Sequence, residues 1–288
     1  MVLADPYASY MYLDLGIEDE LLNKLYSHFE TVLQIQGKMK STGIIGYRRL
    51  DWDHFPEWFS ISKNRRQRGG YSWKVIPLVD VFLEWKAIVY WIDAGCVIRE
   101  GISREVTMAR HYGLYSPRSR HTVSVWVYPK TQEFLVNHHV IPHAVSGDFP
   151  MVSGGLLIMD YANRTILESF IIPYYKCAYT QKCITPIGSD MGNHRQDQSV
   201  LTVMIAALGI PCSGSPSFVY HPALWQDKNN NETLTTTILG NLVLKIQDTY
   251  SIRVTNRMYN TSEFYYTREE YPFISRPRDS GWPLKDNS

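Results

Sequence analysis

An acidic residue follows directly after an apolar, strand-like run of this sequence. The run Ala87-Ile88-Val89-Tyr90-Trp91-Ile92 is rich in β-branched and aromatic residues and ends in Asp93-Ala94-Gly95. An apolar run bounded by small residues predicts a strand that is buried on both faces. Ligands of open α/β sheets bind beyond the carboxyl ends of strands, where Asp93 can hold a metal ion or a hydroxyl and Gly95 admits close backbone approach. The alternative is that Asp93 only caps the next turn.

A second acidic site candidate precedes an apolar helix expected over residues 200–208. Asp197 and Gln198 lie in the segment His194-Arg195-Gln196-Asp197-Gln198-Ser199. A carboxylate here can accept a proton from a hydroxyl or stabilise developing positive charge, and His194 can assist at a phosphate or a metal. Asp197 can equally cap the helix that follows, so capping and catalysis compete for the same oxygen atoms.

A lysine and two glycines lie where an anionic ligand could be held. Lys74 is at the start of a helix expected over residues 73–86, capped by Ser72, where an ammonium and a helix N-terminus could both face phosphate. Gly154 and Gly155 open a second buried strand expected over residues 156–160 and would let the backbone pass close to a ligand. The alternatives without a function are that Lys74 is a surface lysine and that Gly154 and Gly155 form a simple turn. The basic run 63–70 is either a solvated loop or a loop over a diphosphate.

Three histidines suggest a different chemistry. His138, His139 and His143 are close in sequence and could hold zinc in a hydrolase. Pro142 and the β-branched neighbours argue against a helix that would align them, and no acidic motif partner accompanies them. This hypothesis ranks below the others.

Composition limits the classes of protein that fit. The 288 residues include 44% hydrophobic residues and carry a net charge of +1, which gives no nucleic-acid footprint. There is no apolar run of about 18 residues and no signal-peptide pattern at the start of this chain. Four cysteines are too few for a disulfide scaffold, although Cys177 and Cys183 are close in sequence and could pair if the protein is secretory. Three sequons, which begin at Asn163, Asn231 and Asn260, favour a glycosylated, lumenal protein.

Strand and helix patterns alternate along the chain. Strands are expected over residues 7–15, 43–47 and 122–127, and helices over residues 18–36, 102–111, 164–175 and 200–208, in addition to the elements above. There are no internal repeats and no clear linker. The sequence therefore predicts a single α/β domain over residues 1–288, with a core at about 10–210, a C-terminal extension over 211–288, and a poorly ordered last dozen residues.

The order of several short motifs resembles that of the nucleotide-sugar glycosyltransferases of the GT-A fold. More closely, it resembles little-characterised animal glycosyltransferase-like families whose functions are unassigned. The motifs are Asp14-Leu15-Gly16, Tyr71-Ser72-Trp73-Lys74-Val75, Trp91-Ile92-Asp93-Ala94-Gly95, Ser153-Gly154-Gly155-Leu156, Cys177 to Ser189, and His194 to Ser199. The resemblance implies a mixed, mainly parallel sheet flanked by helices. A nucleotide-binding first strand would precede Asp14, and the few residues there predict either a truncated gene product or a protein that has lost part of the donor site.

The resemblance also implies an activity and roles for the candidate residues. Such enzymes move a sugar from a nucleotide diphosphate to an acceptor hydroxyl on a glycan or protein, in the Golgi lumen. Asp93 would then bind the donor and a Mn²⁺ or Mg²⁺ ion, with Lys74, Gly154, Gly155 and His194 also on the donor and Asp197 with Gln198 at the reaction centre. Gly95 occupies the position of the second acid of the family's metal-binding DxD motif, which puts the metal in doubt. The rival prediction is a non-catalytic carbohydrate-binding or interaction protein of the same fold.

Overall fold

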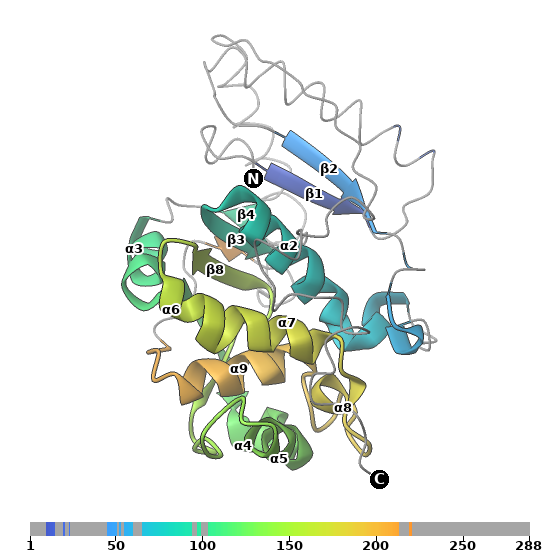
Figure 1. Ribbon diagram of the computed structural model, residues 1–288. Coiled ribbons are helices and arrows are strands. Elements are labelled where there is room, and N and C mark those ends of the chain that lie inside the picture. Colours follow the sequence, from blue (N-terminus) through green and yellow to red (C-terminus); the bar gives the residue numbers. More distant parts are fainter. Residues whose placement is uncertain are drawn as a thin grey trace, which may run out of the picture. The chain divides into compact units, whose positions relative to one another are not determined.

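The computed structural model describes residues 10–14, 20, 23, 45–50, 52, 55–59, 65–93, 97–98, 103–212 and 219–220 (Figure 1). The chain divides into two compact units. The first comprises Met1–Asp51, Gly95–Gly101 and Ser217–Glu263, and the second comprises Trp52–Ala94, Ile102–Pro216 and Phe264–Ser288. The described elements make the protein a mixed α/β structure.

The described part of the first unit consists of two strand pairs. Strand β1 (Tyr10–Asp14) pairs in parallel with β2 (Ile45–Arg49). Strand β4 (Val97–Ile98) pairs antiparallel with β9 (Val219–Tyr220). The strands expected over residues 7–15 and 43–47 are thereby confirmed. The helix expected over residues 18–36 lies outside the described residues, apart from two helical positions at 20 and 23.

The second unit is built on a three-stranded sheet. Its order is β3 (Ile88–Ile92), β8 (Leu156–Asp160) and β5 (Leu114–Tyr115), and both outer strands run antiparallel to β8. All five residues of β8 are buried, as the apolar run 156–160 predicts. Ile92, the last residue of β3, lies opposite Leu156, the first residue of β8.

The direction of this sheet differs from the sequence expectation. The resemblance implies mainly parallel strands, whereas β3, β8 and β5 form an antiparallel sheet. An apolar run is typical of a buried strand but carries no information about the direction of its neighbour. The antiparallel direction brings the residue before β8 next to the residue after β3, and the Asp93 N–H donates to the Gly155 carbonyl oxygen at 2.9 Å.

Four helical segments expected from the sequence are confirmed in the second unit. They are α2 (Val75–Trp85), α3 (Ser103–Tyr112), the continuous run of α6 (Arg164–Ile166), the π-helix η4 (Leu167–Ile171) and α7 (Ile172–Ala178), and α9 (Asp197–Ala207). Helix α7 contacts both α2 and α9 and runs between them (Figure 1). None of the described helices is both long and apolar enough to cross a membrane.

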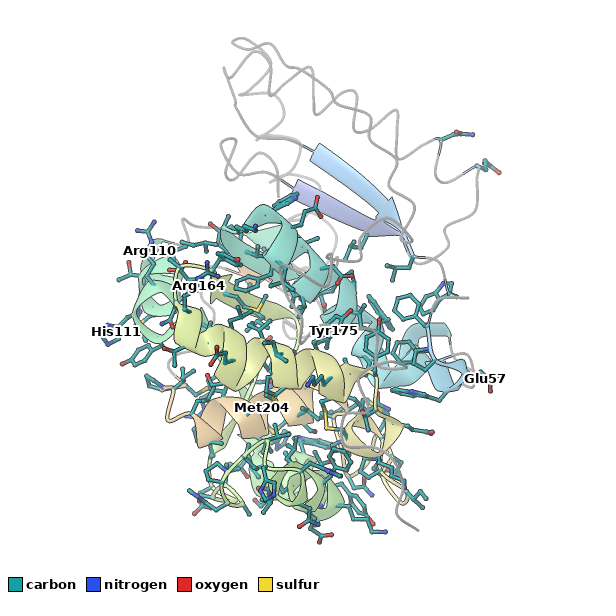
Figure 2. The ribbon with its side chains drawn as sticks, viewed as in Figure 1. Glu57, Arg110, His111, Arg164, Tyr175 and Met204 are labelled. Carbon is teal, nitrogen blue, oxygen red and sulfur yellow. A yellow bond between two sulfur atoms is a disulfide. The ribbon has the colours of Figure 1, made fainter. Side chains whose placement is uncertain are left out.

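The core of this unit is formed by the inward faces of the helices and the sheet. Phe82 on α2 and Ile158 on β8 are completely buried, and Met204 on α9 is almost so. Arg110 and His111 at the end of α3 project outward from the same unit (Figure 2). This segregation of apolar and polar faces is what stabilises helices of such length in proteins.

One expected strand is wrong. Residues 122–127 are predicted to be extended, but Val123–Trp126 form the short helix α4. The N–H groups of Val123 and Ser124 bond instead to the carbonyl oxygens of Phe149 and Gly147. Long-range backbone bonds therefore override the local β propensity of this segment. The strand in this region is β6 (Arg118–Thr122), which pairs antiparallel with β7 (Pro150–Val152).

Short helices complete the unit. They are η2 (Glu57–Phe59), η3 (Arg65–Lys74), α5 (Pro129–Asn137) and α8 (Gln181–Ile184). A disulfide between Cys177 and Cys183 joins α7 to α8, and both cysteines are completely buried. The pairing that their closeness in sequence suggests is therefore present.

Candidate functional site

Three charged side chains from distant segments of the second unit lie close together. Lys74 ends η3, Asp93 follows β3, and Asp197 begins α9. The Lys74 Nζ lies 3.2 Å from the Asp93 Oδ2, with side chains 13% and 31% exposed. Asp197 is buried, and its negative charge acts on both of the others. We refer to Lys74, Asp93 and Asp197 as the charged cluster.

The Asp93 carboxylate is held by donors on both of its oxygens. The Trp91 indole N–H donates to Oδ1 at 2.8 Å, and the Lys74 ammonium donates to Oδ2 at 3.2 Å. Trp91 and Asp93 are two residues apart on extended chain, so their side chains leave the backbone on the same side. Gly155 packs against the carboxylate, because a Cβ at this position would lie 3.2 Å from the Asp93 Oδ2. The close approach predicted for Gly155 is thus made to Asp93.

The backbone before Lys74 is left-handed over three consecutive residues. Gly69, Gly70 and Tyr71 have φ values of 54°, 57° and 62°. A Cβ on Gly70 would lie 2.6 Å from the Thr185 side chain, so this position requires glycine for space as well as for conformation. The Tyr71 backbone is strained, and its ring lies 5.0 Å from the Lys74 Nζ as a cation–π partner.

The charges around Lys74 keep it protonated. Burial alone lowers the pKa of Lys74, but the charges of Asp197 and Asp93 and the hydrogen bond with Asp93 outweigh it, so the pKa lies above the ordinary lysine value.

The sequence expectation that Ser72 caps the following helix is wrong. Helix α2 begins at Val75, and the buried Ser72 Oγ has no partner among the described residues.

Asp197 titrates close to neutral pH. Burial raises the pKa of Asp197 to about 6; the Lys74 charge opposes this shift, the Asp93 charge adds to it, and the backbone N–H groups of Gln198 and Asp197 oppose it. Asp197 is the first residue of α9, and the N-cap position belongs to Gln196, whose side chain makes no cap bond. A carboxylate with such a pKa is suited to accept a proton near neutral pH.

Gln198 lies beside the glycine turn before β8. Its Nε2 donates to the Val152 carbonyl oxygen at 2.7 Å, and a Cβ on Gly154 would lie 3.1 Å from the Gln198 Cβ. Gln198 therefore ties the first turn of α9 to the segment that carries Gly154. Both predicted glycines therefore lie against predicted site residues, Gly154 against Gln198 and Gly155 against Asp93.

His194 is held in a different environment. Its side chain is completely buried, with the Tyr128 N–H donating to Nδ1 at 3.2 Å and Nε2 lying 2.8 Å from the Ile184 carbonyl oxygen. Burial lowers the pKa of His194 to about 4, although the bond to Ile184 opposes this shift. Both ring nitrogens thus join a neutral imidazole to the backbone near α5 and in α8. Gly95, the remaining predicted site residue, lies outside the described residues.

Several polar atoms beside the charged cluster are buried without a partner in the described part of the chain. They are the Ser72 Oγ, the Trp73 Nε1 and the Gln196 Oε1. Buried polar atoms in proteins normally have a hydrogen-bond partner, which can be water or a ligand. Ser72 and Trp73 directly precede Lys74, and Gln196 directly precedes Asp197. These atoms add neutral hydrogen-bonding capacity next to the charges.

The donor groups at Asp93 do not fit a divalent cation. Both carboxylate oxygens already accept from N–H donors, and one of these donors is an ammonium at 3.2 Å that would repel a metal ion. Hard cations such as Mg²⁺ and Mn²⁺ favour several free oxygen ligands. Within the described ranges, no group of three or more His, Cys, Asp or Glu residues is placed to hold a metal, the cluster His138, His139 and His143 included.

Searches against protein-family models, curated proteins and solved structures find no match to this chain. The function is therefore argued from the site itself.

Proposed function

We propose that this protein transfers a sugar from a nucleotide diphosphate donor to an acceptor hydroxyl. The observation that supports this proposal best is the charged cluster, in which three distant segments bring together an ammonium, a buried carboxylate and a partly exposed carboxylate. Burying charges is costly, so such clusters are retained most often where they bind or react. A GT-A-like fold is part of this proposal, and it rests on the order of the sequence motifs.

Asp197 is the proposed general base. In a single displacement, the acceptor oxygen forms a bond to the anomeric carbon while the bond from that carbon to the phosphate oxygen breaks. The acceptor proton passes to the Asp197 carboxylate, and the diphosphate leaves with the electron pair. With a pKa of about 6, Asp197 is ionised at neutral pH and can accept this proton.

Asp93 and Lys74 are the proposed donor-binding residues. The Asp93 side chain is 31% exposed, so a sugar hydroxyl can donate to a carboxylate whose position Trp91 and Lys74 already fix. The Lys74 ammonium can stabilise charge on the leaving phosphate. The unpartnered Ser72 Oγ offers a further contact to a neutral ligand group.

The second candidate function is carbohydrate binding without catalysis. It is favoured by the charge balance, because with Asp197 ionised the charged cluster holds one more negative charge than positive charge. This excess disfavours an anionic diphosphate but not a neutral sugar. A transferase would then need further cations beside the cluster.

The secretory pathway, and the Golgi lumen within it, is the proposed location. The buried disulfide between Cys177 and Cys183 supports an oxidising compartment. Of the three sequons, the one at Asn163 lies within the described residues, where the side chain is half-buried and its Oδ1 accepts from the Ile166 N–H at 3.4 Å.

Nucleotide-sugar turnover tests the proposal. The protein is incubated with UDP- and GDP-sugars and simple glycan acceptors, and released nucleotide and glycosylated product are measured. Asp197→Asn should lower turnover about 10²- to 10⁴-fold, the usual contribution of a general base. The matched control is Asp148→Asn, which removes an exposed carboxylate and should leave turnover unchanged.

The outcomes separate the two functions. Product formation that requires Asp197 supports the transferase. Sugar binding without turnover, detected as a rise in the midpoint of thermal unfolding, supports the non-catalytic function. If neither nucleotide-sugars nor free sugars raise that midpoint, both candidates are rejected.

A further inference from the structure

The Asp93 carboxylate is already neutralised by a group of the protein itself. Lys74 donates to Oδ2 at 3.2 Å, and its ammonium carries the positive charge that a divalent cation would bring to the same oxygen. Asp197, the second carboxylate of the charged cluster, also acts on this ammonium through its charge. The Lys74 ammonium therefore interacts with both carboxylates of the charged cluster.

Lys74 is fixed in this position by its surroundings. Its side chain is only 13% exposed, and the rings of Tyr71 and Trp73 lie 5.0 Å and 6.0 Å from Nζ. The left-handed backbone of Gly69, Gly70 and Tyr71 sets the path of the chain into this residue. Withdrawing the ammonium would remove a positive charge that interacts favourably with both Asp93 and Asp197.

The other oxygen of Asp93 is engaged as well. Trp91 donates to Oδ1 at 2.8 Å, and Gly155 packs so closely that its position allows no Cβ without crowding Oδ2. A metal ion at this carboxylate would lie close to the Lys74 ammonium and be repelled by it. Asp93 remains 31% exposed, so a neutral ligand hydroxyl can still approach it without displacing either donor.

We infer that the Lys74 ammonium is a built-in cation that takes the place of a divalent metal at Asp93, so that ligands bind to this site without metal. The nature of the ligand rests on the proposed function, whereas the replacement of the metal rests on the charged cluster alone. Removing the ammonium should allow the partly exposed Asp93 carboxylate to bind a metal ion, with the negative charge of Asp197 adding to the attraction.

Terbium luminescence tests this conversion. Tb³⁺ is a hard cation that binds carboxylates, and its emission is sensitised by a nearby indole such as Trp91. The wild-type protein should show no Tb³⁺ emission that depends on Asp93. Lys74→Gln should gain Tb³⁺ binding at least about 10-fold tighter than wild type, since a repelling unit charge is removed at close range. Mn²⁺ should displace this Tb³⁺.

Two variants control the measurement. Lys74→Gln combined with Asp93→Asn should lose the gained emission, which assigns it to this carboxylate. Lys130→Gln removes an exposed lysine on α5 and should leave Tb³⁺ emission at the wild-type level. Circular dichroism and thermal unfolding establish that each variant is folded.

Two results would overturn the inference. One is wild-type Tb³⁺ or Mn²⁺ binding that Asp93→Asn abolishes, which can be measured even when Lys74→Gln does not fold. The other is a folded Lys74→Gln variant that gains no metal binding. Neither result involves a nucleotide, so a failure of the proposed transferase activity would leave this test unaffected.

Discussion

The Asp93 carboxylate accepts a hydrogen bond of 2.8 Å from the indole N–H of Trp91, two residues earlier in the same chain segment. This contact joins the aromatic end of β3 to the one half-exposed acid of the charged cluster. Trp91 also packs edge-on against Trp73, with ring centroids 6.2 Å apart. The strand thus supplies the group that orients the acid, and the acid is the first residue after the strand.

Replacing Trp91 with phenylalanine should release Asp93 while keeping an aromatic ring against Trp73. A hydrogen bond to a charged group contributes about 1.5–3 kcal/mol, so Trp91→Phe should lower the free energy of unfolding by up to about this amount. Ligand affinity should fall as well, because Asp93 is no longer fixed on its Oδ1 side. Urea unfolding and ligand titration check the two effects, and unchanged affinity would show that Trp91 does not position Asp93.

Adding a methyl group at position 155 should push the Asp93 carboxylate away. The Cβ of Gly155→Ala would lie 3.2 Å from Oδ2, so we expect weaker ligand binding and slower turnover. Gly147→Ala is a matched control, because its Cβ would lie equally close to the Ser124 Cβ, away from the charged cluster. The control should affect stability only, and equal functional losses in both variants would contradict the role given to Gly155.

Activity should depend on pH through Asp197. The pKa of Asp197 is raised by burial to about 6, and the proposed general base must be ionised. Turnover should therefore rise as pH increases through about 6 and level off above it. The pH profile of the residual activity of Asp197→Asn should lack this rise near pH 6. A step that persists in the variant would assign the titration to another group.

Stability should depend on pH through His194, with a definite sign. The pKa of His194 is lowered by burial to about 4, below its unfolded value of about 6.5. The unfolded chain therefore binds a proton first, and the folded state loses stability as pH falls from about 6.5 towards 4. The loss amounts to about 3 kcal/mol at most. Asp197 acts in the opposite direction below pH 6, because its raised pKa favours protonation of the folded state.

The variant His194→Gln isolates this contribution. Glutamine keeps a neutral donor and acceptor but does not titrate. The difference in unfolding free energy between wild type and variant should therefore change between pH 6.5 and pH 4 and stay constant above pH 7. Chemical denaturation at a series of pH values measures this difference, and a constant difference throughout would contradict the assignment.

The sequence is informative about which residues enter the site and less so about how they are brought together. Asp93, Lys74 and Asp197 stand out because charged residues adjoin apolar elements, and the structure brings these three side chains together. The direction of the sheet is not encoded in the apolar runs of β3 and β8, so the antiparallel pairing could not be predicted from them.

Some features of the site have a local sequence signal and others have none. The spacing of Trp91 and Asp93 is sufficient to predict that they share one face, and it was a usable sign of their hydrogen bond. The left-handed conformation of Tyr71 has no such sign beyond the two glycines before it. The environment of His194 could not be predicted from the sequence either, because its backbone partners at Tyr128 and Ile184 come from separate segments that no local pattern connects.

The assembly of the charged cluster from separate segments has a consequence for folding. Asp93 and Asp197 are about 100 residues apart in the chain, and α9 is the last described helix of its unit. Contacts of such large sequence separation form late and slow the folding reaction. During synthesis, Lys74 and β3 leave the ribosome long before Asp197 has been added to the chain. The charged cluster can therefore be completed only after α9 has docked against the rest of the second unit.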